Sequence, residues 1–514
     1  MNVLLVNPNR ERMPWPAVPI GLCTVATALD RAGHDVELVD LTFARDPFKT
    51  TFEAARRRSP DVVGITVRNL DNCNFESPVF YLKEIRDAVV RAVRQGAPSA
   101  RIVIGGSAVN VSPEDCFRYL EVDYALVGEG EEALPRFLAA LEAKAEFSSE
   151  SVPGLLGAAA TRDPGKLLRT IGPRAAPGEP IGGRAVVRDL ETSARSEAWR
   201  WVRLSQYQAN GGPFSVQTKR GCALKCSYCV YNGIEGRAYR LRKPEAVVDE
   251  IQQATEHGVR NVEFVDSTFN LPLSHGRALL DELARRALPV ELSTMGLNPA
   301  GVRADFIESM KRAGFKSVMC TPESASDVTL ASLNKGYDKG AVIRAADALR
   351  RTGLRTFWFF MIGAPGETLD TVRETLEFCE EYVPKDDMVL FTTGIRVYSG
   401  TPLEAYCKEI GWFAADDPLF LPSWYLSPEL DFEALYGMLV RAAESHPNWM
   451  TNAETVLGPA MATVMKGAFR MLGWKGPFWQ HLPKLHRLTA RSRKRGLAEH
   501  HERLRRITDV PHHS

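Results

Sequence analysis

Short apolar runs alternate with amphipathic segments over residues 1–145. The runs VLLVNPN, VELVDL, VVGITV, RIVIGG and YALVGEG are separated by stretches with helical spacing, such as GLCTVATALDRAGH and YLKEIRDAVVRAVRQG. Buried strands that alternate with helices are typical of a parallel sheet covered on both faces. The pattern predicts a doubly wound α/β domain, with the loops after its strands lining one edge where such sheets bind ligands.

A second alternating series begins at Val216 and defines a central domain over 213–404. Its predicted strands are VQTKR, VEFVD, VELSTM, SVMCTP, TFWFFMIG and MVLFTTG, and helical stretches such as PEAVVDEIQQATEHG separate them. Six strand–helix units fall short of a closed eightfold barrel, so we expect an open, partial (β/α)6 barrel.

The segments before and after the central domain have a different residue composition. Residues 146–212 are rich in Pro, Gly, Ser and Arg, which predicts a partly ordered linker with a small hairpin. Residues 405–514 predict a mainly helical region rich in Trp, with a distinctly basic tail.

Composition narrows the class of protein. Hydrophobic residues make up 45% of the 514 residues, charged residues 25%, and the formal net charge is +1. These values predict a globular chain and disfavour binding to nucleic acid or anionic membrane through bulk charge. The sequence lacks a long apolar run and a signal-peptide pattern at its start, so we expect a cytoplasmic protein.

Three of the nine cysteines fall in one short stretch, GCALKCSYCVY, as Cys222, Cys226 and Cys229. Soft thiolate ligands select zinc, copper(I) or iron–sulfur clusters. A structural zinc site needs four protein ligands, and neither a second CxxC nor a nearby histidine is present, the closest being His257 and His275. A [4Fe–4S] cluster held by three cysteines leaves one iron open for a substrate or cofactor.

CALKCSYC resembles the CxxxCxxC signature of radical S-adenosylmethionine (SAM) enzymes, including the aromatic residue, here Tyr228, before the last cysteine. The resemblance implies that the open iron binds SAM, that SAM is cleaved to a 5′-deoxyadenosyl radical, and that an external flavodoxin- or ferredoxin-type protein donates electrons. It also implies further cofactor contacts in the segments VEFVDSTFN, CTPESASDVTLASLNKG and FFMIGAPGET. The residues implied in these three segments are Asp266, Asn270, Glu323, Ser324, Gly363 and Pro365.

A doubly wound domain ahead of such a core resembles the cobalamin-binding subclass of these enzymes. The phrases VNPN, IGGSAVN and VGEGEEALPRFL fit that subclass, whereas the DxHxxG motif that supplies a lower axial histidine in many cobalamin domains is absent. The only histidine before residue 250 is His34, in a helix-to-strand turn. The implied cobalamin contacts are Asn7, Pro19, Gly21, Thr66, Arg68, Asn69, Gly105, Gly106, Ser107, Gly128, Glu129 and Gly130.

The resemblance implies a methyltransferase that acts on an unactivated carbon of a small-molecule substrate. An alternative with the same cofactors is a cyclase, rearrangement enzyme or oxidoreductase without methyl transfer. A zinc-binding interaction protein and an RNA-modifying enzyme are the remaining alternatives, although the sequence contains no recognisable RNA-binding module. The Trp-rich end of the chain is expected to cover the site and to select the substrate, and His446 is a candidate group on the substrate side.

Overall fold

The computed structural model describes residues 1–145, 152–157 and 184–452, together with 467, 471, 478–482, 484 and 486. Much of the predicted linker, Trp474 and the basic tail from residue 487 onward lie outside the described residues. Among the described helices, none has the length and apolar character needed to cross a membrane.

The N-terminal sheet has six strands in the order β2-β1-β3-β4-β5-β6. Strands β1 to β5 are parallel, and β6 runs antiparallel to β5. The strands are β1 (Asn2–Asn7), β2 (Asp35–Asp40), β3 (Val62–Thr66), β4 (Arg101–Gly105), β5 (Tyr124–Leu126) and β6 (Leu155–Gly157). The strand order reverses between β1 and β3, which opens a ligand-binding crevice at the carboxyl ends of the strands in folds of this kind.

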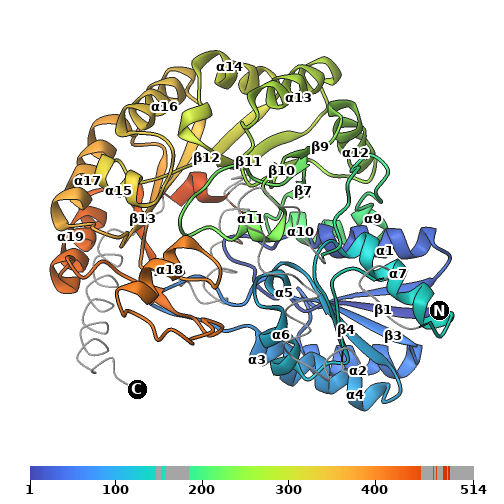
Figure 1. Ribbon diagram of the computed structural model, residues 1–514. Coiled ribbons are helices and arrows are strands. Elements are labelled where there is room, and N and C mark those ends of the chain that lie inside the picture. The colour runs from blue at the N-terminus through green and yellow to red at the C-terminus, as the bar shows by residue number, and fades with distance from the viewer. Residues whose placement is uncertain are drawn as a thin grey trace.

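Helices cover both faces of this sheet, as the doubly wound prediction requires (Figure 1). Helices α1 (Ile20–Arg31) and α7 (Gly130–Glu142) bury apolar side chains in one core cluster, and the remaining helices bury theirs in another. The remaining helices are α2 (Pro47–Arg58), α3 (Leu82–Glu84), η1 (Ile85–Val90), α4 (Arg91–Gly96), α5 (Ser107–Val111) and α6 (Pro113–Leu120). The predicted α/β domain is therefore confirmed.

The central sheet is an open arc of seven parallel strands in the order β17-β14-β13-β12-β11-β10-β7 (Figure 1). The strands are β7 (Phe214–Val216), β10 (Asn261–Phe264), β11 (Glu291–Leu297), β12 (Phe315–Glu323), β13 (Arg355–Ile362), β14 (Met388–Thr393) and β17 (Trp449–Thr451). The open barrel is confirmed, and β17 adds a seventh strand in a region predicted to be mainly helical. A strand of three residues is too short to show a periodic pattern.

The first strand of the arc differs from its predicted position. It begins at Phe214 and ends at Val216, and the chain then forms β8 (Lys219–Arg220), which pairs antiparallel with β9 (Arg240–Leu241). The cysteine segment is the connection between β8 and β9.

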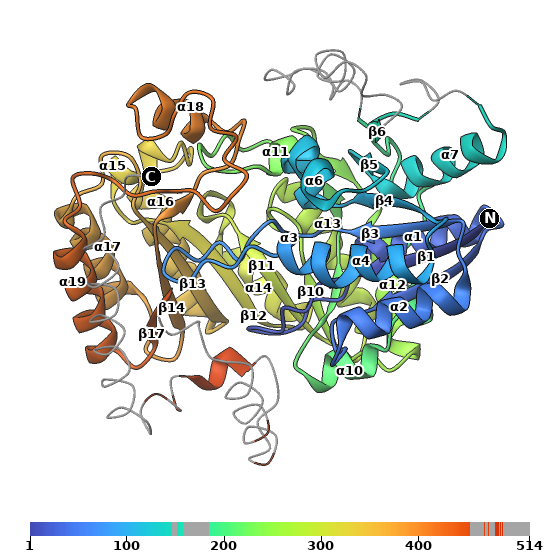
Figure 2. The ribbon, with the colours of Figure 1, turned by 90° about the horizontal axis from the view of Figure 1, so that it is seen from below.

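Helices pack on the outer side of the arc, and the largest apolar core lies between them and the strands. They are α12 (Pro244–Glu256), α13 (Leu273–Arg286), α14 (Ala304–Arg312), α15 (Asp327–Ser332), α16 (Lys339–Thr352), α17 (Leu369–Tyr382) and α19 (Phe432–Ser445). Because side chains alternate along a strand, those that do not enter this core face the inside of the barrel. Figure 2 shows the N-terminal domain beside the barrel, joined to it by several crossing segments.

Two of these segments fix the domains to each other. After the linker, α9 (Ala198–Trp201) and α10 (Leu204–Ala209) dock on the N-terminal domain: the Trp201 indole donates to Thr27 Oγ1 at 2.9 Å, and the Tyr207 hydroxyl donates to Asp40 Oδ2 at 2.8 Å. The loop after β3 places Asp71 in a fully buried ion pair with Arg396 on β15 (Ile395–Arg396), with Nε and Oδ2 2.8 Å apart. These contacts make one rigid connection between the domains.

Candidate active site

The cysteine loop is held open by backbone hydrogen bonds. Gly221 has φ of +94°, and a Cβ there would lie 2.1 Å from the carbonyl oxygen of Ala238, so only glycine fits. The Cys222 amide donates to the Gly236 carbonyl at 3.0 Å, and the Ser227 amide donates to the Leu333 carbonyl at 2.9 Å. The loop is thus tied at both ends, to β9 and to the turn after α15.

The three cysteines of this loop lie close together in a buried position. Burial raises the pKa of the Cys226 thiol, the Lys335 ammonium lowers it, and Glu323 and Cys222 raise it further. Cys226 and Cys222 likewise act on the pKa of Cys229, which burial raises to about 12. No group of three or more His, Cys, Asp or Glu side chains in the described part of the chain converges on a single metal ion. In a [4Fe–4S] cluster each cysteine thiolate binds a different iron.

Glu323 and Lys335 form a polar pair beside the cysteines. Lys335 Nζ lies 2.9 Å from Glu323 Oε1, and the Tyr228 hydroxyl donates to the same oxygen. Both members of the pair are more than nine-tenths buried, yet Glu323 Oε2 has no hydrogen-bond partner. Glu323 also has φ of +64°, a conformation that few non-glycine residues adopt and that is common at functional sites. The carboxylate and the ammonium match the α-amino and α-carboxylate groups of SAM, so these residues fit that cofactor.

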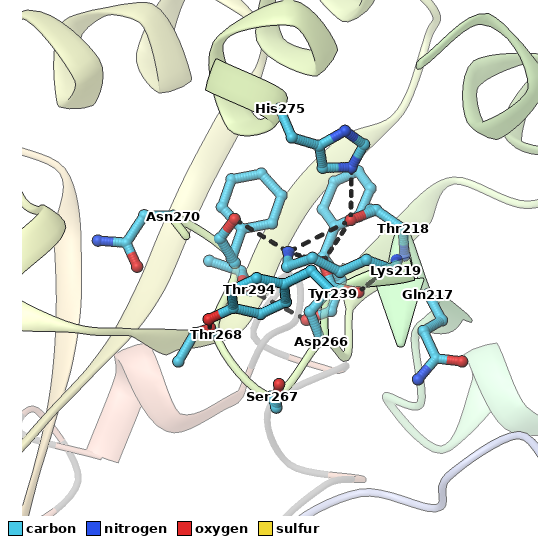
Figure 3. A network of polar contacts seen from close by, with 12 residues as sticks. Gln217, Thr218, Lys219, Tyr239, Asp266, Ser267, Thr268, Asn270, His275 and Thr294 are labelled. Atoms are coloured by element: carbon cyan, nitrogen blue, oxygen red, sulfur yellow. Dashed lines mark hydrogen bonds and ion pairs between the residues drawn. The ribbon is translucent and has the colours of Figure 1, made fainter. Parts of the chain in front are cut away.

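Asp266 lies in a buried network of polar contacts with Thr218 and Lys219 (Figure 3). Its Oδ1 accepts the Thr218 amide at 2.7 Å, and its Oδ2 accepts the Thr218 hydroxyl at 2.6 Å and Lys219 Nζ at 2.9 Å. His275 joins the network through Thr218 Oγ1. These partners bond both carboxylate oxygens, so Asp266 anchors the strand that leads into the cysteine loop. A cofactor contact at Asp266 stays a prediction.

Three other predicted SAM contacts are also occupied by the protein. Asn270 is fully buried and exchanges hydrogen bonds with the backbone of Asn298 at 2.8 and 3.0 Å. The Ser324 hydroxyl bonds Thr375 Oγ1 at 3.1 Å. The Gly363 amide donates to Glu367 Oε2 at 2.6 Å, and its carbonyl accepts the Ser427 amide at 3.1 Å. Each of these groups has a partner within the protein, and Pro365 is half-buried. Cofactor contacts at all four residues stay predictions.

The crevice edge of the N-terminal domain presents exposed polar and small residues. Arg68 and Asn69, in the loop after β3, are exposed, as is Ser107 at the start of α5. Gly21 is exposed too, with no atom within 4 Å of the position that a Cβ would take. Open space and exposed polar groups at this edge fit a large flat cofactor such as cobalamin.

The other residues expected at this edge are half-buried or buried. Gly106 has φ of +107°, and a Cβ there would meet the Val67 carbonyl at 2.7 Å, so it shapes the turn after β4. Those that are half-buried and stay predictions are Pro19, Thr66, Gly105 and Gly130. The Asn7 side chain is buried against Asp40 and Thr42, and a Cβ on Gly128 would meet the Ala185 backbone at 2.3 Å, so cobalamin contacts at these two residues also stay predictions.

Glu129 connects the domains and does not face the crevice. Its carboxylate lies 2.7 Å from Arg240 Nη2 and 3.2 Å from Arg220 Nη1. Burial favours the neutral form, but the hydrogen bond from Arg240 and the charge of Arg220 hold the pKa of Glu129 below its ordinary value. Glu131 lies 2.5 Å from Arg220 and adds to this cluster. These ion pairs attach the loop after β5 to the strands that flank the cysteines. A cobalamin contact at Glu129 stays a prediction.

Two histidines, His34 and His446, make contacts that stabilise the fold. His34 contacts the amino group of Met1, at the edge where the strands begin, which is opposite to the crevice. His446 caps α19, with Nδ1 2.9 Å from the Ala442 carbonyl and its ring stacked on Trp449. His34 therefore lies at the wrong edge to be an axial ligand, and His446 has the surroundings of a helix cap.

Several residues between the crevice and the cysteines gave no signal in the sequence. Tyr231 and Met295 are exposed on α11 (Tyr231–Ile234) and β11. Burial raises the pKa of the Tyr231 phenol to about 12, and the guanidinium of Arg68 partly opposes this shift. Lys335 was missed because its signal is a contact across the fold, with Glu323 twelve positions away.

Two domain families match this chain. Residues 14–138 match the B12 binding domain, and residues 216–379 match the radical SAM superfamily. Together they span the crevice edge and the cysteine loop with most of the barrel.

Named relatives share both domains over most of the chain. The tryptophan 2-C-methyltransferase of Streptomyces laurentii is 28% identical over 73% of this chain and 69% of its own length. The anaerobic magnesium-protoporphyrin IX monomethyl ester cyclase of Cereibacter sphaeroides is 25% identical over 75% of this chain and 60% of its own length. The structure of the radical SAM methyltransferase TsrM from Kitasatospora setae, with tryptophan substrate and a SAM analogue bound, superimposes with a TM-score of 0.76 at 25% identity, covering 96% of this chain and 99% of that one.

These matches agree with the cysteine trio, the Glu323–Lys335 pair and the exposed crevice edge. The cofactors of the chain are a [4Fe–4S] cluster, SAM and cobalamin. The chain therefore contains a B12 binding domain followed by a radical SAM domain, and over most of its length it is similar to the methyltransferases named above.

Proposed function

We propose that the chain is a C-methyltransferase that acts on an unactivated carbon of a small-molecule substrate. The observation that carries this proposal is the Glu323–Lys335 pair beside the three cysteines, with its unpartnered Glu323 Oε2, in a barrel that follows a B12 binding domain. When bound, the cluster and SAM supply one-electron chemistry at carbon, and cobalamin supplies a methyl group. The names of the relatives, among them a tryptophan methyltransferase, support methyl transfer.

The residues of this chain have separate tasks in the proposal. Cys222, Cys226 and Cys229 hold the cluster, and Glu323 with Lys335 holds the amino acid end of SAM beside it. The Lys335 ammonium also carries a positive charge next to the Cys226 thiol, which favours the thiolate that binds iron.

The far end of the barrel is closed by apolar side chains. Trp15 packs with Phe357, Leu390 and Met450 in one cluster, which also includes Trp479. Trp479 comes from the C-terminal region, and the proposal includes a role for this region in covering the site. An apolar cover would exclude water from a site in which reactive intermediates must meet only their intended partner.

A cyclase or another enzyme without methyl transfer is the alternative, since one relative is named a cyclase. The proposal further includes a flavodoxin- or ferredoxin-type electron donor and a cytoplasmic location. Neither feature affects the test of methyl transfer.

The test is an anaerobic incubation of the reconstituted enzyme with methyl-labelled SAM and candidate substrates, beginning with L-tryptophan and indole. Methyl transfer predicts a product heavier than its substrate by one labelled CH₂ group, measured by mass spectrometry. A product of altered mass without label, with 5′-deoxyadenosine formed, would favour the alternative and contradict the proposal.

A further inference from the structure

A groove crosses the outer helices of the barrel. It lies between α16 and the segment that links β11 to α14, which includes the short 3-10 helix η2 (Pro299–Gly301). Figure 1 shows α14 and α16 side by side on the outer side of the arc, away from the N-terminal domain. The groove has a volume of about 870 Å³, and Gly336 and Tyr337, in the turn between α15 and α16, form one end of it.

The groove carries positive charge that the fold leaves unpaired. Arg303 and Arg351 line it and are exposed, and neither guanidinium has an ion-pair or hydrogen-bond partner among the described residues. Two carboxylates also line the groove, but each is already paired with an arginine. These pairs are Asp338 Oδ1 with Arg344 Nη2 at 3.7 Å and Asp347 Oδ1 with Arg350 Nη2 at 2.7 Å. The unpaired charge therefore favours a partner with a negative surface.

The turn after α15 joins the groove to the cysteine loop. The Asn334 side chain donates to the Lys225 carbonyl of that loop at 2.9 Å. The next residue, Lys335, bonds Glu323 beside the cysteines at 2.9 Å, and Gly336 then lines the groove. A partner seated in the groove would therefore lie against the segment that holds the cysteine loop, without entering the barrel.

Lys225 extends the positive charge to the cysteine loop itself. It directly precedes Cys226 and is exposed, as is Ala223, and its ammonium has no ion-pair partner within the described part of the chain. On the other side of the loop, α11 packs against α5 of the N-terminal domain. The loop is therefore open to a partner on the side of Ala223 and Lys225, where its charge has the same sign as that of the groove.

We propose that this groove, together with the exposed side of the cysteine loop, is the docking surface for an acidic electron-transfer protein that carries a flavin or an iron–sulfur centre. This inference rests on the proposed function, which includes an external electron donor, and it names the surface that the donor uses. The reduced donor loses one electron, the cluster gains it, and no bond forms or breaks. The interior of the barrel stays available for the cofactors and the substrate.

The experiment measures binding of the full-length enzyme, loaded with cluster and cobalamin, to two acidic probes, a bacterial flavodoxin and a plant-type [2Fe–2S] ferredoxin. The test variant combines Arg303→Glu with Arg351→Glu. The matched control combines Lys316→Glu with Lys385→Glu, which changes the net charge by the same amount. Both lysines are exposed and have no ion-pair partner among the described residues. They lie at the amino ends of β12 and β14, the edge opposite to the cysteine loop.

We expect the wild-type enzyme to bind at least one probe at low ionic strength, and added salt to weaken this binding because it screens exposed charges. The test variant should bind that probe roughly ten- to hundredfold more weakly, since attraction at two positions becomes repulsion. The control variant should bind it as the wild type does. With titanium(III) citrate as a small reductant, the test variant should form 5′-deoxyadenosine at the wild-type rate, because its cysteines and its SAM site are intact.

A milder variant separates docking from damage to the fold. Arg303→Gln with Arg351→Gln removes the two charges without reversing them, so it should weaken probe binding by a smaller factor than the glutamate variant. Three results would each overturn the inference: no binding of either probe by the wild type, equal weakening in the test and control variants, or loss of the titanium-driven 5′-deoxyadenosine in both arginine variants. Incorporation of labelled methyl is measured separately, so failure of the proposed function remains distinguishable.

Discussion

The most informative side chains near the cysteines are those whose buried polar atoms lack partners. Glu323 Oε2 is such an atom, although its neighbour Oε1 is bonded to Lys335 and Tyr228. Buried polar atoms are normally paired, so an exception beside a cofactor site marks a place for a ligand. Asp266 shows the reverse case, since protein groups occupy both of its oxygens.

Lys335 allows a test of the SAM site at this scale. Lys335→Gln keeps a donor for Glu323 but removes the positive charge, so we expect the dissociation constant for SAM to rise roughly ten- to hundredfold. Iron content should stay near the wild-type value, because the cysteines are intact. Equilibrium dialysis with labelled SAM measures the change. Lys339→Gln, at an exposed site on α16, is the control, and equal SAM affinity in the two variants would contradict the assignment.

Glu367 predicts a pH dependence of stability. Burial raises its pKa to about 7 from an ordinary value of 4.5. The protonated form is therefore favoured by the fold, and the associated stabilisation is present below about pH 4.5 and is lost as the pH rises through 7. Glu367→Gln should have the same melting temperature as the wild type at pH 5 and a higher one at pH 8. The expected gain in the free energy of unfolding at pH 8 is up to about 3 kcal/mol. A difference of the opposite sign at pH 8 would show that the carboxylate itself is favoured.

At the scale of elements, the apolar pattern predicted the strands that have core contacts on both sides. It placed β1 to β5 and β10 to β14 within a few residues, because long buried strands have a clear composition. It missed β17 and the separation of β7 from β8. These strands are two or three residues long, and their pairing depends on neighbours from elsewhere in the chain. The same limit applies to Glu129, whose partners lie about a hundred residues away on β8 and β9.

The ion pairs of Glu129 give a prediction at this scale. Glu129→Ala leaves the partly buried Arg240 and Arg220 without this partner. Removing one member of a fully buried ion pair costs about 3–5 kcal/mol of stability, and the cost here is smaller because the side chains are only partly buried. We expect a lower melting temperature and faster proteolysis between the domains. Glu132→Ala removes an exposed pair with Arg136 on the same helix and should change little. Equal effects of the two substitutions would show that the domains are not joined through Glu129.

At the scale of the whole molecule, segments that are distant in the sequence meet near the cysteine loop. The loop after β3 supplies Arg68, the β8–β9 connection supplies the cysteines, and the end of β12 supplies Glu323. The sequence motifs indicated the cofactors because each motif is one continuous stretch of the chain. They could not reveal Lys335 or Tyr231, whose positions at the site depend on how distant segments pack together.

The measurement that tests the central claim most directly compares the wild-type enzyme with Cys226→Ala and Cys379→Ala in one anaerobic assay with methyl-labelled SAM. Cys379 is buried on α17, outside the cysteine loop, and is the matched control for loss of one thiol. We predict 5′-deoxyadenosine and labelled product from the wild type and from Cys379→Ala, and neither from Cys226→Ala. Formation of 5′-deoxyadenosine or methylated product by Cys226→Ala would contradict the account.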